Sequence, residues 1–82
     1  MSMASFLLHH RHQPRECGVA YASFKGHPSP LRRSDAVSSC LSGGHELWWV
    51  VAAASSEAAL ALLPDFVASR TTVTSVRKVV IP

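Results

Sequence analysis

The sequence predicts a small α+β domain in which one antiparallel sheet carries two helices on one face. From Gly44 to Ile81, a β-rich stretch, an alanine- and leucine-rich stretch and a second β-rich stretch follow one another. This is the pattern of a strand, a helix and a strand. The first half of the chain shows the same order of strand and helix. Because 82 residues suffice for one modest core, we expect residues 1–82 to form a single domain.

The N-terminal half begins with an expected strand and an expected helix. The run Met3–His10, MASFLLHH, is short and mostly apolar, as strands often are. Pro14 suits the first position of a helix, and Gly26 is placed to end it. Apolar residues recur between them at positions i, i+3, i+4 and i+7, which predicts one apolar helical stripe. The residues of this stripe are Cys17, Ala20, Tyr21 and Phe24.

The segment between Gly26 and Gly44 is rich in proline, serine and glycine, which is typical of loops. We expect at most one short strand there, within Leu31 to Leu41. This second strand is the element that the pattern determines least.

The second half of the chain has a sharper pattern. The run His45–Ala53, HELWWVVAA, is dense in aromatic and β-branched residues and predicts a strand. Two serines then precede Glu57 at the start of a helix. Pro64 lacks an N–H group and disfavours helical geometry in the residue before it, so the helix should bend or restart there. The β-branched run Thr71–Ile81 predicts the last strand.

The strand His45–Ala53 is apolar on both faces, which predicts a partner chain. Alternation places Leu47, Trp49 and Val51 on one face, and Trp48, Val50 and Ala52 on the other. Two helices cover only one face of a sheet. The same face of a second copy is the most economical cover for the other, so we expect a symmetric homodimer. Partial cover by the chain's own long loop remains the alternative.

The expected order of strand, helix, short strand, strand, helix and strand is the ferredoxin-like succession βαββαβ. With this order, the segment ALALLPDFVASRTTVTSVRKVVI resembles the dimeric α+β barrel superfamily, in which two ferredoxin-like protomers pack sheet to sheet. The segments HRHQPRECGVAYASFKGHPSPLR and CLSGGHELWW resemble a branch of short bacterial proteins of that type without an assigned activity. The resemblance covers nearly the whole chain. It implies a fold and a homodimer, but the superfamily includes enzymes of several kinds and metal-binding members, so it implies no particular activity.

Charge and hydropathy exclude several classes of protein. The net charge is +3, but the eight basic residues are scattered in ones and twos, so we expect no nucleic-acid partner. The longest apolar run, Leu47 to Ala54, is far shorter than the about 20 residues of a membrane span. The opening MSMASFLLHHRH lacks the apolar core of a signal peptide. Two cysteines without a CxxC pair agree with a reducing compartment, so we expect a cytoplasmic protein.

Histidine and cysteine side chains are expected to meet at one end of the sheet. If the first strand pairs antiparallel with the strand that starts at His45, the end of the one lies beside the start of the other. The first helix and the loop that carries Cys40 begin at the same end. Imidazole and thiolate groups suit zinc, nickel or copper. The expected metal ligands are His10, His12, Cys17, Cys40 and His45, with His9 and Glu16 close by.

Three functional hypotheses remain open at this level. The first is a small dimeric protein that binds a transition metal or a small ligand through the histidine and cysteine residues. The second is a cofactor-free enzyme acting on a small metabolite, with His10, His12 or His45 as acid or base in a pocket floored by Trp48 or Trp49. The third is a purely structural module, in which Cys17 is only a small buried apolar residue. No catalytic residue is assigned, because the chain has no GxSxG, HExxH or phosphate-binding glycine-rich motif.

Overall fold

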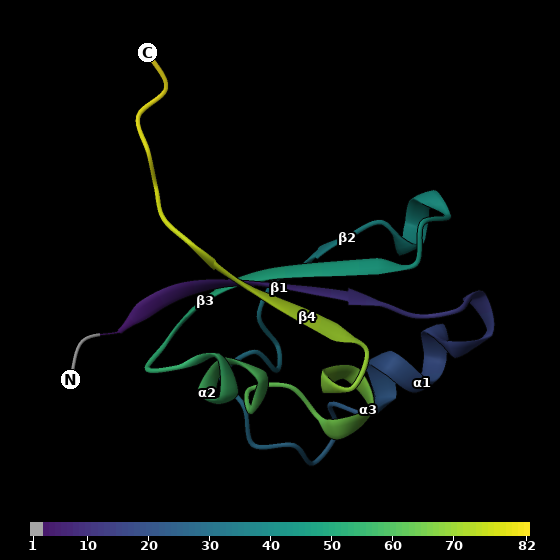
Figure 1. The fold of residues 1–82 in the computed structure, drawn as a ribbon. Helices are drawn as coiled ribbons and strands as arrows, with labels where there is room; N and C mark the ends of the chain where they lie inside the picture. The colour runs from purple at the N-terminus through teal and green to yellow at the C-terminus, as the bar shows by residue number, and fades with distance from the viewer. Residues whose placement is uncertain (1–2) are drawn as a thin grey trace.

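A computed structural model describes residues 3–82 as a four-stranded antiparallel sheet with short helices (Figure 1). The strand order is β2-β3-β1-β4, and each neighbouring pair runs antiparallel. The expected α+β class is therefore confirmed. The elements are β1 (Ala4–Arg11), η1 (Pro14–Glu16), α1 (Cys17–Ala22), β2 (Val37–Ser38), η2 (Cys40–Ser42), β3 (Glu46–Ala53), α2 (Ser56–Leu60), α3 (Asp65–Ala68) and β4 (Thr71–Val76).

The two central strands are β1 and β3, and both were expected from the sequence. β1 pairs with β3 along all eight residues and with β4 on its other side, so Leu8 lies between Trp49 and Val73. The strand expected within Leu31 to Leu41 is present, but as the two-residue β2 at the sheet edge. No helix in the part of the chain that the structure describes is long and apolar enough to cross a membrane.

The helices are shorter than the sequence suggests. The first begins as the 3-10 turn η1, with Pro14 in its first turn, and continues as α1. Its expected stripe is only partly correct, because Ala20 is buried and Phe24 packs on the core while Tyr21 is about half exposed. In the second half Ser55 caps α2 by accepting a hydrogen bond from the Ala58 N–H. Pro64 ends that helical run and serves as the N-cap of α3, as its missing N–H predicts.

The last strand was expected to reach Ile81, and the structure corrects this boundary to Val76. The reason lies in the register, because Val76 pairs with Ser5 and β1 begins at Ala4. Beyond this pair only Ala4 of β1 remains, so β4 has almost no strand left to pair with. Residues 77–82 leave the sheet and project from the molecule (Figure 1). The radius of gyration, 13.2 Å, accordingly exceeds the about 12 Å of a compact domain of this length.

The core lies between the sheet and the helices. The inward residues of β1 and β3 pack against Ala59, Leu63 and Val67 from the α2–α3 region. This inner face contains Phe6, Leu8, Leu47, Trp49, Val51 and Ala53. Alternation along β3 is as expected, because Trp48, Val50 and Ala52 point to the other face and are more exposed than their neighbours. All three α-helices lie on the inner side, so the described chain leaves the outer sheet face without a helical layer (Figure 1).

Candidate metal centre

The ends of β1 and β3 bring two of the expected ligands together. The His12 N–H donates a hydrogen bond to the His45 carbonyl at 3.2 Å, which extends the pairing of the two strands by one step. The 3-10 turn η1 follows at once and delivers Cys17 as the first residue of α1. Glu16 does not face the cluster, because its Oε1 accepts a hydrogen bond from the Gln13 N–H at 2.8 Å. The turn is therefore capped by a carboxylate while Cys17 points to the histidines.

The turn between β2 and β3 carries Cys40 and ends at His45, so it positions both of these ligands. It is closed by the Gly44 N–H, which donates to the Ser39 carbonyl at 2.8 Å. Gly43 has a φ of +86°, where glycine has no steric penalty. His45 has a φ of +55°, which costs a non-glycine residue on the order of 1 kcal/mol or more. Such a conformation persists where the surrounding turn imposes it, and here it fixes the direction of the His45 ring.

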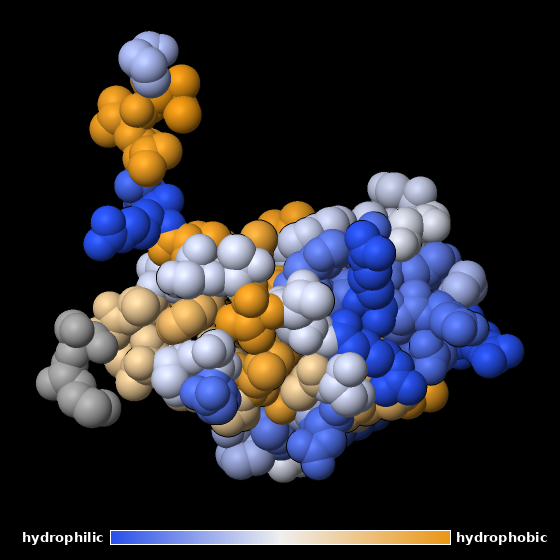
Figure 2. Space-filling model, in the orientation of Figure 1, coloured by the Kyte–Doolittle hydropathy of each residue, from blue (hydrophilic) through white to orange (hydrophobic). Residues whose placement is uncertain are grey.

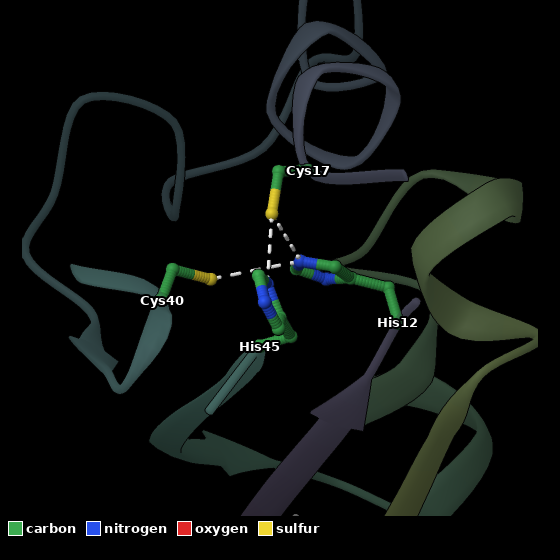
Figure 3. A group of neighbouring side chains, drawn as sticks. All are labelled: His12, Cys17, Cys40 and His45. Carbon is green, nitrogen blue, oxygen red and sulfur yellow. Dashed lines mark hydrogen bonds between the residues drawn. The ribbon is translucent and has the colours of Figure 1, made fainter. Parts of the chain in front are cut away.

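Four side chains converge on one point (Figure 3). One ligand atom from each of His12, Cys17, Cys40 and His45 lies within 4.8 Å of the other three. The His12 Nε2 is 3.2 Å from the Cys17 Sγ and 3.6 Å from the Cys40 Sγ. The Cys17 Sγ is 3.0 Å from the His45 Nδ1. The four residues come from the end of β1, the start of α1 and the β2–β3 turn, so the fold itself assembles the group.

These separations match the edges of a tetrahedral coordination shell. With Zn–S bonds of about 2.3 Å and Zn–N bonds of about 2.0 Å, tetrahedral geometry places neighbouring ligand atoms about 3.3 to 3.8 Å apart. The contact from His12 Nε2 to Cys40 Sγ, 3.6 Å, falls in this range, while the contacts of Cys17 Sγ with His12 Nε2 and His45 Nδ1, 3.2 and 3.0 Å, are slightly shorter. All four atoms lie within 4.8 Å of one another, so one metal ion can contact them once the more distant pairs draw together by up to about 1 Å.

His10 lies behind His12 and not in the group of four. Its ring has no exposed surface. The His10 Nδ1 is 3.2 Å from the Val67 carbonyl oxygen, and its Nε2 is 3.0 Å from the His12 Nδ1. A carbonyl oxygen only accepts hydrogen bonds, so His10 Nδ1 carries the proton and donates it. In a neutral ring Nε2 then accepts, so His12 Nδ1 must be the donor. The His12 Nε2 is left with a free lone pair directed at the two thiols.

The pKa shifts of the two histidines favour these neutral rings. Burial, followed by the charge of a protonated His12, lowers the pKa of His10 below its ordinary value. Burial, followed by the charge of a protonated His45, lowers the pKa of His12. Near neutral pH both rings are therefore uncharged, and the hydrogen-bond chain from Val67 through His10 holds His12 in the tautomer that a metal needs.

The two thiols differ in their surroundings. Burial and the neighbouring Cys40 raise the pKa of Cys17. Burial also acts to raise the pKa of Cys40, but the Ser38 hydroxyl, the Tyr21 hydroxyl and the Cys17 thiol outweigh it and lower the pKa overall. Cys40 is thus the thiol that ionises more readily, and a bound cation would favour the thiolate form of both.

The structure brings four of the five expected ligands together and separates the remaining residues of the cluster. His9 lies on the outer sheet face, where its ring stacks on Trp48 and its Nε2 pairs with the Glu46 carboxylate at 2.5 Å. The Val67 carbonyl, which orients His10, was not expected from the sequence. A backbone carbonyl has no residue type to recognise, so no sequence signal could have found it.

No protein-family model, curated protein sequence or solved structure matches this chain.

Gly44 is a position where one methyl group should disturb the site. A Cβ at Gly44 would lie 2.3 Å from the Ser39 Oγ, and that hydroxyl is held by the Glu46 N–H at 3.1 Å. We expect Gly44→Ala to lower the free energy of unfolding by about 1 to 3 kcal/mol, because the turn must shift to avoid the overlap. Denaturant unfolding and a zinc titration measure the two effects, and zinc affinity should fall as Cys40 and His45 move.

Gly18 provides the matched control for this substitution. It lies in α1, and a Cβ there meets nothing within 4 Å. Gly18→Ala should therefore raise stability by up to about 1 kcal/mol and leave metal affinity unchanged. Equal behaviour of the two alanine variants would contradict the role given to the Gly44 turn.

Proposed function

We propose that this protein binds a zinc ion through His12, Cys17, Cys40 and His45. The observation that carries the proposal is the convergence of four ligand atoms within 4.8 Å of one another. Two thiolates and two imidazoles in a tetrahedral arrangement suit zinc better than nickel or copper(II), which favour square-planar or tetragonal surroundings. Both cysteines are free, and they agree with a reducing, cytoplasmic setting in which thiols stay available to a metal.

The metal in this proposal is structural. Four protein ligands complete a tetrahedral shell and leave no open position for a reacting molecule. The ion would join the β1–α1 connection to the β2–β3 turn, and Cys17 and His45 are 28 residues apart in the chain. A domain of this size buries only about 60% of its unfolded surface, so such a link supplies stability that the core alone lacks.

Metal content of the untagged protein tests the proposal directly. We expect about one zinc per chain by elemental analysis after purification, and competition with a chromogenic chelator should give a defined affinity. Co²⁺ in place of zinc should show the visible absorption of a tetrahedral site with thiolate ligands. Clearly substoichiometric metal, together with unchanged melting after chelation, would overturn it. Stoichiometric nickel or copper would retain the site and replace zinc as its metal.

His10 provides a test of how the site is held in place. We expect His10→Leu to weaken zinc binding about 10- to 100-fold, because His12 loses the acceptor that fixes its tautomer. His10→Gln should retain affinity within a few-fold, since an amide can donate to the Val67 carbonyl and accept from His12 Nδ1–H. Chelator competition measures both variants. A glutamine variant as weak as the leucine variant would argue against this positioning role.

The enzyme hypothesis receives less support from the structure. A cavity of about 270 Å³ does lie beside Trp49, but none of the five histidines lines it. The acid or base expected from His10, His12 or His45 is therefore not in contact with that space. His12 does line a more open hollow with Gln13 and Glu16, but neither Trp48 nor Trp49 forms its floor. Metal binding remains the function that the geometry supports best.

We also propose that two copies pack through their outer sheet faces in a ferredoxin-like α+β dimer. The strand order β2-β3-β1-β4 and the split connections support this fold. Val37 and Val50 on the outer face are 68% and 69% exposed, with Trp48 paired opposite Val37 and Leu7 paired opposite Val50. Apolar residues also gather on the projecting segment 77–82, as the orange surface in Figure 2 shows.

The area available fits a dimer only if the projecting segment takes part. The strands β1, β3 and β4 lie about 4.8 Å apart and are about 20 to 26 Å long, so together they present about 350 Å². A stable dimer buries about 800 Å² on each partner. Val79, Val80 and Ile81 are 74%, 95% and 81% exposed and extend the apolar surface beyond the sheet edge. A second copy that covers both the sheet face and this segment would approach the required area.

A single charge on the outer face should separate the two copies. We expect the wild-type protein to have twice the 8.8 kDa chain mass in solution, and Val50→Lys to have the mass of one chain. Val19→Lys is the matched control, because Val19 is also exposed but lies on α1, on the other side of the sheet. Light scattering coupled to size exclusion measures the masses. A monomeric wild type, or equal effects of both lysines, would contradict this dimer.

A further inference from the structure

The cavity beside Trp49 is a second site, separate from the metal ligands. Its volume is about 270 Å³. Small-molecule sites usually have volumes of about 300 Å³ or more, so this cavity suits a small ligand. Its residues come from the end of the first helix, from loop residues 31–36 and from the inner face of β3. None of the four candidate zinc ligands lines it. An inference about this cavity therefore does not depend on the proposed metal.

The inner wall of the cavity is apolar and aromatic. Leu47 and Trp49 from β3 form part of it, and Phe24 lies opposite with its ring centroid 6.1 Å from that of Trp49. Tyr21 and Leu31 add to the same lining. Leu47 and Trp49 are each less than 10% exposed, and both belong to the sheet. This wall is therefore in place before any ligand binds. A flat apolar group fits such a surface better than a sugar or a hydrated ion does.

The rim of the cavity is cationic. Lys25, Arg32 and Arg33 line it, so three of the eight lysine and arginine residues of the chain gather around one small space. Within residues 3–82 no carboxylate forms a salt bridge with any of the three. Asp35 is near in sequence but is not among the lining residues. Three unpaired cations over an apolar wall favour a ligand that carries negative charge on one edge.

The loop that presents the two arginines is internally bonded. The Arg32 N–H donates to the Ser29 carbonyl at 3.1 Å, and the Ser34 N–H donates to the Leu31 carbonyl at 3.2 Å. The Ser34 hydroxyl also donates to the Leu31 carbonyl at 2.7 Å. Leu31 packs against the core and anchors the loop, while Arg33 adopts a φ of +66°. Successive turns of this kind hold the backbone of both arginines beside the cavity.

We propose that this cavity binds a small aromatic carboxylate, with the ring against Trp49 and Phe24 and the carboxylate at Arg32, Arg33 and Lys25. Arginine binds a planar carboxylate through two parallel hydrogen bonds, which gives the rim its selectivity for the anion. The apolar wall supplies the remaining affinity by removing the ring from water. The site goes beyond metal binding and gives the protein a ligand-binding role of its own.

NMR titration with 2-naphthoate tests the site, and 2-naphthamide serves as the neutral probe of the same shape. We expect the Trp49 indole N–H and the amides of residues 31–36 to shift on binding. The Trp48 indole lies on the opposite sheet face and should stay unchanged. The carboxylate should bind at least about tenfold more tightly than the amide, because only it forms charge-assisted hydrogen bonds. Equal affinity of the two probes would overturn anion recognition.

Two double variants each remove two positive charges, one at the cavity and the other away from it. Arg32→Ala with Arg33→Ala should weaken 2-naphthoate binding about 10- to 100-fold and leave 2-naphthamide binding unchanged. Arg77→Ala with Lys78→Ala is the matched control, because both residues lie in the projecting segment, away from the cavity lining. All four side chains are exposed, so neither variant disturbs the core. Equal weakening by both pairs would show general charge attraction and overturn the site, as would the absence of a shift at Trp49.

Discussion

Removal of the metal is expected to lower the melting temperature of this protein by about 15 to 30 °C. A ligand present at a thousand times its dissociation constant stabilises the folded state by about 4 kcal/mol. In a domain of 60 to 100 residues, each kcal/mol changes the melting temperature by about 4 to 8 °C. Differential scanning calorimetry at pH 7.5, with zinc in excess and then with EDTA in excess, measures the difference. The pH matters because protons compete with zinc for thiolate and imidazole ligands.

The reversal of this effect is as informative as the effect itself. Zinc added back to the chelated protein should restore the original transition, whereas Mg²⁺ should not, because it prefers oxygen ligands. A melting temperature that EDTA leaves unchanged, in protein shown to contain zinc beforehand, would mean that the metal is not bound at a structural site.

Loss of one ligand should nearly abolish tight zinc binding, and His12 is the informative position. Structural zinc sites yield about 10 to 16 kcal/mol, so one of four ligands accounts for about 3 to 4 kcal/mol. This corresponds to an affinity about 100- to 1,000-fold weaker for His12→Ala. His12 also contacts both thiols, at 3.2 and 3.6 Å, so its removal opens the centre of the group. Chelator competition measures the affinity, and circular dichroism verifies the fold.

The control for His12 is another histidine of the same strand region. His9 lies on the outer face, bonded to Glu46 and stacked on Trp48, so His9→Ala should leave zinc affinity within a few-fold of the wild type. Cys17→Ala and Cys40→Ala should resemble His12→Ala. Similar losses for His9→Ala and His12→Ala would point to nonspecific binding by imidazole groups and contradict the site.

The sequence predicts the class of fold and the end of the sheet where the ligands meet, because both follow from pairing rules. Once β1 and β3 run antiparallel, the residues after Arg11 lie beside those before Glu46. The pattern also predicts the break at Pro64, since a missing N–H acts locally. Alternation along β3 separates Trp49 from Trp48 for the same reason. Each of these features depends on neighbouring residues and short-range geometry.

Features that depend on long-range packing are not readable in the same way. His10 was expected among the ligands, but it lies two residues before His12 along the strand, and its hydrogen bonds to the Val67 carbonyl and to His12 Nδ1 keep its ring behind His12. The end of β4 at Val76 depends on where β1 begins, although the β-branched run continues to Ile81. The cavity beside Trp49 arises from a loop whose composition predicts only irregular structure. Each of these features depends on which segment, distant in the sequence, packs beside the residues concerned.

The placement of all four candidate ligands at one end of the sheet has a consequence for how the domain opens. At the Arg11 end of β1, backbone pairing would be reinforced by metal bonds, whereas at the Ala4 end β1 and β3 are held by the ladder and core packing without a metal. Local unfolding starts where fewest contacts must break. Fraying should thus begin at Ala4, Ala53 and Val76 and move toward the metal, so amide hydrogens near His10 would exchange last. In this 82-residue chain, one bound metal ion would hold one end of the sheet together while the opposite end of the sheet opens first.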